Sequence, residues 1–267
     1  MKRNGSNLTG RIMNIILSFM ILVALFSVGS AQTAEETKTV LTGAAIMDKY
    51  VEATGGAKAY DDIKSMFLKT TMNMSVGATL DISIYTARPD LFYSRAESKE
   101  IGTMEQGYDG QICWEKSMAQ GPRIITGAER QDIVRDNAAM DRINNWRNYY
   151  DSAILAGVDT VEGALANKVV VYPKQDKPQI FYFDQNSGFL VKLTASYDSQ
   201  MGEIPMDSYL SEYRKAGEIM LPFKTIIKFM GQGQIVIIDS VACNVEIPPD
   251  LFKLPEEIKA LIKPEQK

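Results

Sequence analysis

The chain has 267 residues, of which 45 % are hydrophobic and 23 % charged, and its formal net charge is −4. This composition is typical of a globular protein with material for one large domain or two small ones. The acidic balance and the lack of a basic cluster argue against nucleic-acid binding. Histidine is absent and the two cysteines are far apart. We therefore expect no His-dependent triad, no metal site and no cofactor.

Residues 1–31 have the pattern of a secretory signal peptide: a basic start, an apolar run over 12–29, and small residues at the end. Cleavage after Ala31 removes three positive charges and takes the net charge from −4 to −7. The alternative is a retained single-pass anchor, because the run nears the roughly 20 residues that span a bilayer. A bacterial lipoprotein signal requires a cysteine directly after the apolar run, and none stands there. No later segment is apolar enough to span a membrane. We expect a periplasmic protein that is not a lipoprotein.

The rest of the chain predicts a lead at residues 32–42 and a single domain over residues 43–267. The lead is small and polar, so we expect it to be flexible. Residues 41–56 predict a helix with one apolar face, because Met47, Tyr50 and Val51 recur at helical spacing before Gly55-Gly56. A further short helical turn is expected at residues 57–65.

Short strands follow these helices. Residues 79–87 alternate strictly, with Leu80, Ile82 and Ile84 on one face and polar residues on the other, which predicts a sheet with one wet face. Further strands are expected at residues 91–98, 102–110 and 111–116, with a hairpin turn at Asp109-Gly110.

Residues 128–150 contain no glycine or proline and predict an amphipathic helix, interrupted near Asn144-Asn145, that covers one face of the sheet. Ile143 and Trp146 lie on its apolar side. A second series of strands is expected at residues 153–163, 166–173, 178–184, 188–198, 205–215, 220–230 and 234–244.

The segment FYFDQNSGFLVKL, residues 181–193, is typical of the second series, since Asn186, Ser187 and Gly188 form a turn between two apolar strands. Residues 235–242 are apolar on both faces, which predicts a central strand covered by a helix. A loop and a short amphipathic helix close the chain at residues 248–263. Ten to twelve short antiparallel strands without an internal repeat indicate a curled sheet, barrel or sandwich, and not a βαβ fold.

Five segments resemble, in order, the bacterial outer-membrane lipoprotein-sorting proteins of the LolA/LolB-like superfamily. They are KYVEATGGAKAYDDIKS, GYDGQICWE, FYFDQNSGFLVK, SEYRKAGEIMLPF and CNVEIPPDLFKLP, and they cover nearly the whole mature chain. The match is to the broad branch of this superfamily, and the carrier's functional arginine has no matching position here. The resemblance implies a mostly β (α+β) fold, a strongly curved antiparallel incomplete β-barrel with helices over its open side. In the family's carriers the cavity between them receives lipoprotein acyl chains.

Such a cavity would be lined by apolar side chains on the inner face of the strands and on the covering helix. The candidates are Leu80, Ile82, Ile84, Trp114, Phe181, Phe183, Phe229, Ile143 and Trp146. For each of them the alternative is an ordinary core position. Because side chains alternate along a strand, Phe181 and Tyr182 cannot both point inward.

Catalytic chemistry finds little support in the sequence. Asp109 and Asp184 are better explained as turn residues whose side chains bond the local backbone. Cys113 has no histidine to form its thiolate. The two cysteines, Cys113 and Cys243, are two small thiols in apolar strands or, alternatively, a disulfide pair.

We therefore expect a non-enzymatic periplasmic carrier that binds a lipid or a lipoprotein acyl chain by burial. The alternative is a sensory or scaffolding module of the cell envelope that binds a partner protein without a lipid ligand. Neither function involves nucleic acid or a stable transmembrane segment after signal cleavage.

Overall fold

The computed structural model describes residues 41–75, 77–137, 145–174, 177–199 and 202–262. The expected signal peptide and nearly all of the expected lead lie outside these residues, so both stay predictions. Among the described helices, none is long and apolar enough to cross a membrane.

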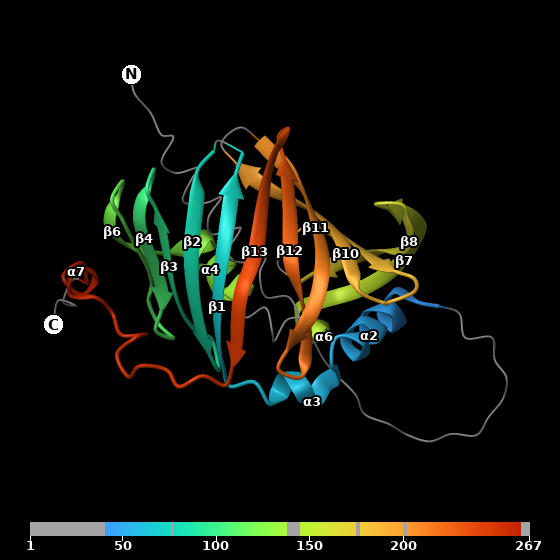
Figure 1. Ribbon diagram of the computed structural model, residues 1–267, viewed down its shortest axis with the longest axis horizontal. Coiled ribbons are helices and arrows are strands. Elements are labelled where there is room, and N and C mark those ends of the chain that lie inside the picture. The colour runs from blue at the N-terminus through green and yellow to red at the C-terminus, as the bar shows by residue number, and fades with distance from the viewer. Residues whose placement is uncertain (1–40, 76, 138–144, 175–176, 200–201, 263–267) are drawn as a thin grey trace. The chain divides into compact units, whose positions relative to one another are not determined.

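The described chain is mostly β, as predicted, and its thirteen strands form one antiparallel order, β6-β5-β4-β3-β2-β1-β13-β12-β11-β10-β9-β8-β7 (Figure 1). Two meanders in chain order, β1 to β6 and β7 to β13, thus meet where β1 neighbours β13. The order is open, with β6 at one end and β7 at the other. The strands are β1 (Ser65–Met74), β2 (Thr79–Ala87), β3 (Leu91–Ser98), β4 (Gly102–Tyr108), β5 (Cys113–Ser117), β6 (Gly121–Ile125), β7 (Tyr150–Val161), β8 (Ala164–Pro173), β9 (Gln179–Asp184), β10 (Leu190–Ser199), β11 (Gly202–Ala216), β12 (Ile219–Phe229) and β13 (Gln232–Cys243).

The chain divides into two compact units. Unit 1 contains residues 63–139 and 238–267, and unit 2 contains residues 140–237 together with the segment that ends at Asp62. Strand β13 contributes its first half to unit 2 and its second half to unit 1. The expectation of a single domain over residues 43–267 stays a prediction.

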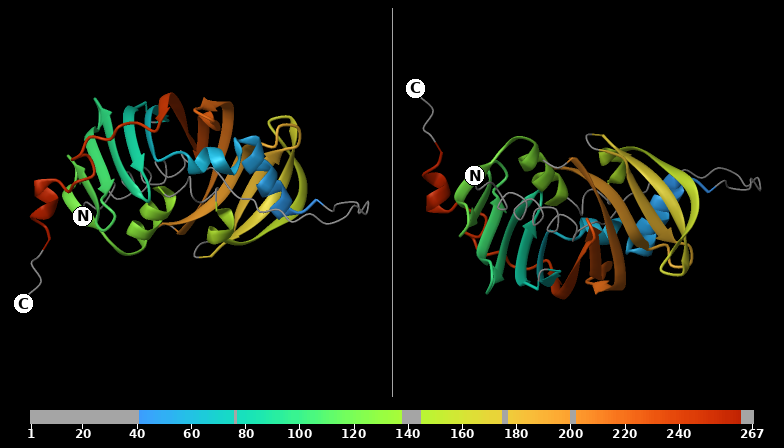
Figure 2. Two further views of the ribbon diagram at one scale, coloured as in Figure 1. Left: turned by 90° about the horizontal axis from the view of Figure 1, so that it is seen from below. Right: turned by 90° about the horizontal axis from the view of Figure 1, so that it is seen from above.

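In unit 2, helix α2 (Gly43–Ala53) lies against the sheet, and α3 (Gly56–Asp61) and α6 (Trp146–Tyr149) flank it. Figure 2 shows α2 in blue beside β7 and β8 in yellow. The hydroxyl of Thr42 caps α2 by accepting a hydrogen bond from the Ala45 N–H at 3.1 Å. Helix and strand approach closely at Gly43, where a Cβ would stand 2.5 Å from the carbonyl oxygen of Ala153 on β7. We call the sheet surface under α2 the α2 face.

In unit 1, helix α4 (Gly127–Asn137) packs on one face of the strands, which we call the α4 face. Its Ile133 joins a buried cluster of strand residues, which are Phe92, Tyr108, Cys113 and Ile125. Helix α4 covers the first part of the predicted helix over 128–150 and α6 covers its end, up to Tyr149; residues 138–144 lie outside the described chain. Strands β1 and β6 were not anticipated from the sequence.

Strand β13 corrects a second expectation. It is central in the strand order, as predicted, but it is not covered on both faces. Gln234, Val236 and Ile238 are buried, whereas Ile235 and Ile237 are 37 % and 38 % exposed. The run of isoleucine and valine is thus split by strand alternation into one buried row and one exposed row.

The contact at Gly43 predicts a destabilising substitution. Gly43→Ala should lower the free energy of unfolding by about 1–3 kcal/mol, because the new methyl group overlaps the Ala153 backbone. The loss should appear although alanine forms helix better than glycine by about 1 kcal/mol. Urea denaturation followed by circular dichroism measures it. Gly233→Ala on β13 is the control, since no atom lies within 4 Å of its added Cβ. Equal stability of the two variants would contradict the close packing of α2 on β7.

Candidate functional site

The α2 face carries a chain of aromatic side chains. The ring of Tyr50 on α2 lies 5.3 Å from that of Phe183 on β9, and Phe183 lies 6.1 Å from Phe181 on the same strand. Phe181 in turn meets Tyr150 edge-on at 6.1 Å. All four side chains are at most 2 % exposed. The structure therefore brings the predicted residues Phe181 and Phe183 together on the surface that α2 covers.

Two tyrosine hydroxyls on this face lie close together and are hydrogen-bonded locally. The Tyr213 hydroxyl donates to the Leu190 carbonyl oxygen at 2.8 Å and lies 3.5 Å from the Tyr50 hydroxyl. Burial raises the pKa of both tyrosines well above the ordinary value of 10. Both phenols stay neutral at physiological pH, so this surface carries no charge from them.

Trp146 closes the same region from α6. Its indole N–H donates to Asp48 Oδ1 on α2 at 3.0 Å, and Arg147 donates to both oxygens of that carboxylate at 2.7 Å. The Arg147 guanidinium also stacks 4.2 Å from the Trp146 ring. Asp48 therefore ties α6 to α2. Trp146 is 3 % exposed and is held as part of the helical cover.

The α4 face of unit 1 gathers the predicted residues of β2. Leu80, Ile82 and Ile84 are at most 4 % exposed and share a face, and their register partners on β1 are Met72, Thr70 and Leu68. Thioether and aliphatic side chains form this part of the face, which also carries a buried polar row of Ser94, Gln106 and Glu115. Neither described cysteine forms a disulfide. Burial raises the pKa of the Cys113 thiol to about 12, so it is not a nucleophile at neutral pH.

Polar contacts hold α4 on this face. Arg123 on β6 donates to Glu115 on β5 at 2.9 Å and to both oxygens of Glu129 on α4, at 2.7 and 3.0 Å. Glu115 is 2 % exposed. Arg130 on α4 donates to the Tyr108 hydroxyl at 3.0 Å. Among the helix side chains that the structure describes, Ile133 and Val134 join the apolar cluster, so charges and hydrogen bonds are a substantial part of the attachment.

Trp114 lies on the opposite face of unit 1 from Cys113 and from the β2 residues. Its ring lies flat over Gly107 on β4, where a Cβ would come within 2.8 Å of the indole. There it borders a pocket of about 520 Å³ between strands β3 to β5 and residues 250–259, which include α7 (Glu256–Lys259). Trp114 and the β2 residues thus cannot line one surface.

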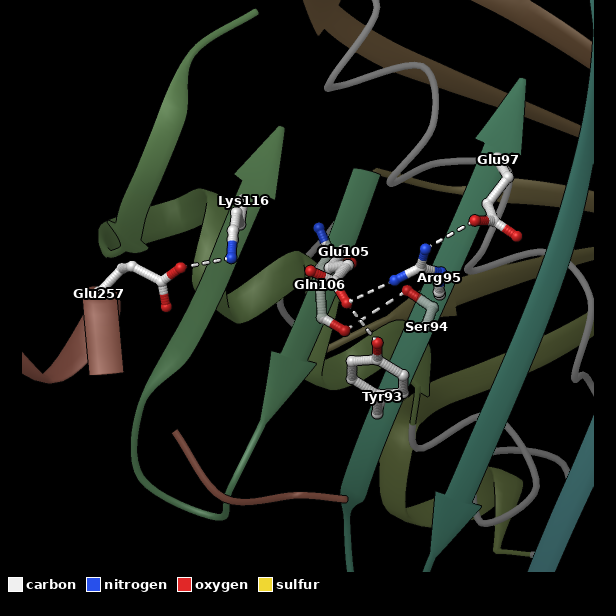
Figure 3. A network of polar contacts seen from close by, with 8 residues as sticks. All are labelled: Tyr93, Ser94, Arg95, Glu97, Glu105, Gln106, Lys116 and Glu257. Atoms are coloured by element: carbon white, nitrogen blue, oxygen red, sulfur yellow. Dashed lines mark hydrogen bonds and ion pairs between the residues drawn. The ribbon is translucent and has the colours of Figure 1, made fainter. Parts of the chain in front are cut away.

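This pocket is polar as well as aromatic (Figure 3). The Tyr93 hydroxyl donates to Glu105 Oε1 at 2.6 Å, and Arg95 reaches the same oxygen at 3.3 Å. Lys116 pairs with Glu257 at 2.5 Å and so holds α7 against β5. No pattern in the sequence predicts this pocket, because its two sides are far apart in the chain.

The remaining candidates fall elsewhere. Phe229 is half-buried at the end of β12, and Ile143 lies outside the described residues. Asp109 and Asp184 sit in turns as expected: Asp109 Oδ1 accepts from the Ile112 N–H at 2.7 Å, and Asp184 Oδ1 accepts from the Ser187 N–H at 2.7 Å. The hydrogen bonds from Ser187 lower the pKa of Asp184.

Solved structures of known proteins share this fold. A LolA superfamily protein from Nitrosomonas europaea superposes with a TM-score of 0.55 and 12 % identity, over 80 % of this chain and 99 % of that one. A DUF1329 family protein from Desulfovibrio piger superposes with a TM-score of 0.54 and 15 % identity, over 79 % and 97 % of the two chains. No family model and no curated protein sequence matches the chain. The fold is therefore LolA-like, as the sequence resemblance implied.

The ion pairs of Arg123 predict how α4 is held. Arg123→Met should lower the free energy of unfolding by about 2–4 kcal/mol, because it leaves the Glu115 carboxylate buried without a partner. Adding Glu115→Gln to that variant should recover part of the loss. Lys58→Met is the control: it breaks the pair with Asp62, whose side chains are 87 % and 60 % exposed, and should change stability by at most about 0.5 kcal/mol. Equal losses for Arg123→Met and Lys58→Met, measured by urea denaturation, would refute a structural role of this network.

Proposed function

We propose that the protein binds a lipid or a lipoprotein acyl chain between its sheet and its covering helices, as a carrier of the outer-membrane lipoprotein-sorting type. The LolA-like fold supports this function, and one observation carries it: in each unit a helix covers a sheet face whose buried side chains are mainly apolar. Transfer of about a dozen methylenes from water to such a surface gains roughly 8–10 kcal/mol before ordering costs. Burial alone is then sufficient for binding, with no covalent step.

The attachment of α4 suits a cover that moves. A helix held by a broad apolar stripe exposes that stripe when it lifts, which costs free energy in proportion to the area. Helix α4 contributes few apolar side chains and is held by Arg123 and Arg130. When it lifts, these polar groups become hydrated, so the cost of opening is small compared with that of an apolar helix.

Several features support a non-enzymatic, exported protein. The chain has no histidine, its best-placed carboxylates are engaged in turns, and the Cys113 thiol is protonated at neutral pH. Residues 1–31 would direct the chain to the periplasm, where cleavage leaves a soluble carrier of acyl chains.

A second function is favoured by one specific observation. Strand β7 ends the strand order, and on β7 and β8 the side chains of Ile154, Val158 and Leu165 are 52 %, 55 % and 57 % exposed. An exposed apolar edge strand is a typical site for an added strand of a partner protein. An envelope module that binds a partner protein at β7 is therefore the alternative to a lipid carrier.

Native mass spectrometry separates the two functions. The chain over residues 32–267, purified gently from a bacterial periplasm, should carry an added mass of a phospholipid or acyl group that organic extraction removes. A bare chain that also fails to bind a fluorescent fatty acid would refute the carrier function and favour the partner-binding module.

The two tryptophans predict where the acyl chain lies. Trp114→Phe leaves Trp146, which contacts α2, as the sole tryptophan, and Trp146→Phe leaves Trp114 on the opposite face from α4. A fatty acid brominated on its chain should quench the fluorescence of Trp114→Phe and leave Trp146→Phe nearly unchanged, because bromine quenches on contact. The unbrominated fatty acid is the control for indirect effects. Stronger quenching of Trp146→Phe would place the chain in the pocket beside residues 250–259 and contradict the α2 face as the site.

A further inference from the structure

The sheet face of unit 2 that is turned away from α2 carries an ordered row of lysine and tyrosine. Lys168, Tyr182, Lys192 and Tyr209 are direct register partners on β8, β9, β10 and β11. We call these four residues the Lys–Tyr row. The same line continues through Ile226 on β12 to Ile235 on β13. It therefore crosses six neighbouring strands, a width of roughly 24 Å.

The ammonium groups lie against the tyrosine rings. Lys192 Nζ is 5.3 Å from the centroid of Tyr182 and 5.2 Å from that of Tyr209. Lys168 Nζ is 5.7 Å from Tyr182, and Lys228 Nζ, one step along β12, is 4.5 Å from Tyr209. These contacts fix the cations on the sheet surface. They also bury Tyr182 to 6 % exposure while Lys228 stays exposed.

The positive charge of this face is only partly neutralised. Lys192 pairs with Asp207 at 2.8 Å, and Lys224 lies 3.9 Å from Glu212. In the described part of the chain, Lys168 and Lys228 have no carboxylate within ion-pair distance. This local excess of positive charge stands on a protein whose net charge is −4. At physiological ionic strength, charges elsewhere on the protein are screened beyond about 8 Å, so an anionic surface that approaches this face interacts mainly with these lysines.

Apolar side chains lie beside the cations. Ile235 and Ile237, on the exposed row of β13, are 37 % and 38 % exposed. On the same face, Tyr182 belongs to a small buried cluster whose other buried members are Val161 and Ala166 of the neighbouring strands. No described helix takes part in it. The face is thus broad, cationic and aromatic, with aliphatic side chains available at one end.

We propose that this face docks on the surface of an anionic phospholipid bilayer. Lysine ammonium groups attract lipid phosphates, the half-buried ring of Tyr209 favours the lipid–water boundary, and the exposed isoleucines enter the acyl region. An acidic protein partner would satisfy the lysines but would leave the isoleucines without a role. A bilayer satisfies both.

Vesicle flotation tests this docking. The periplasmic chain should bind vesicles of phosphatidylglycerol and phosphatidylcholine, should not bind phosphatidylcholine alone, and should be released by added salt. Lys168→Gln/Lys228→Gln should weaken binding to the anionic vesicles about 25-fold, since each lysine near such a surface contributes about fivefold. Lys49→Gln/Lys58→Gln, with the same charge change on α2 and α3, should bind within about threefold of the unchanged protein.

Two outcomes would overturn the proposal. One is the absence of binding to anionic vesicles by the unchanged protein, which would leave an acidic protein as the partner of the row. The other is an equal loss of vesicle binding in both double variants, which would show that binding depends on net charge and not on this face. The bilayer surface and the acyl site lie on opposite sides of the unit 2 sheet. Binding of a fluorescent fatty acid in solution, measured on the same variants, therefore keeps the two proposals separate: it should be unchanged in Lys168→Gln/Lys228→Gln.

Discussion

The alternation of side chains along antiparallel strands, kept in register from strand to strand, is the constraint on which the other features depend. In unit 2 it places Phe181 and Phe183 under α2 and turns Tyr182 to the opposite face. In unit 1 it places Leu80, Ile82 and Ile84 on the α4 face and Trp114 on the reverse. The two faces of the strands thereby differ in chemistry. A register shift of a single residue would exchange them, so the register must be kept.

The two covering helices use different physical means on similar surfaces. Helix α2 is fixed by close contact, with Gly43 against the Ala153 backbone and Tyr50 among aromatic rings. Helix α4 is fixed by ion pairs and hydrogen bonds around Arg123 and Arg130. Close packing resists any displacement, whereas the polar groups that link α4 to the strands can be hydrated when they separate. In a carrier, α2 would serve as the permanent wall and α4 as the movable one.

The sequence predicted much of this arrangement where a single rule decides the outcome. Strict alternation revealed β2, and turn residues revealed Asp109 and Asp184 in their loops. Strand β1 was missed because its inward row mixes methionine, leucine and threonine, and thus gives a weak periodic signal. The face of Trp114 depends on its register with Gly107, which leaves room for the indole. The glycine opposite this tryptophan becomes a recognisable signal only when the pairing of the two strands is known. The pairing of Lys116 with Glu257 joins residues 141 positions apart, and no local pattern predicts it.

The buried thiol of Cys113 is a built-in reporter of how often α4 opens. It lies under α4 beside Ile133, and its pKa of about 12 keeps it in the unreactive thiol form while the helix is in place. Alkylation therefore requires the helix to lift, and its rate under native conditions counts those openings. Cys243 is half-buried and lies outside that cluster, so its alkylation in the same sample serves as an internal reference. The opening proposed for α4 can thus be timed with and without an added fatty acid in the unmodified chain.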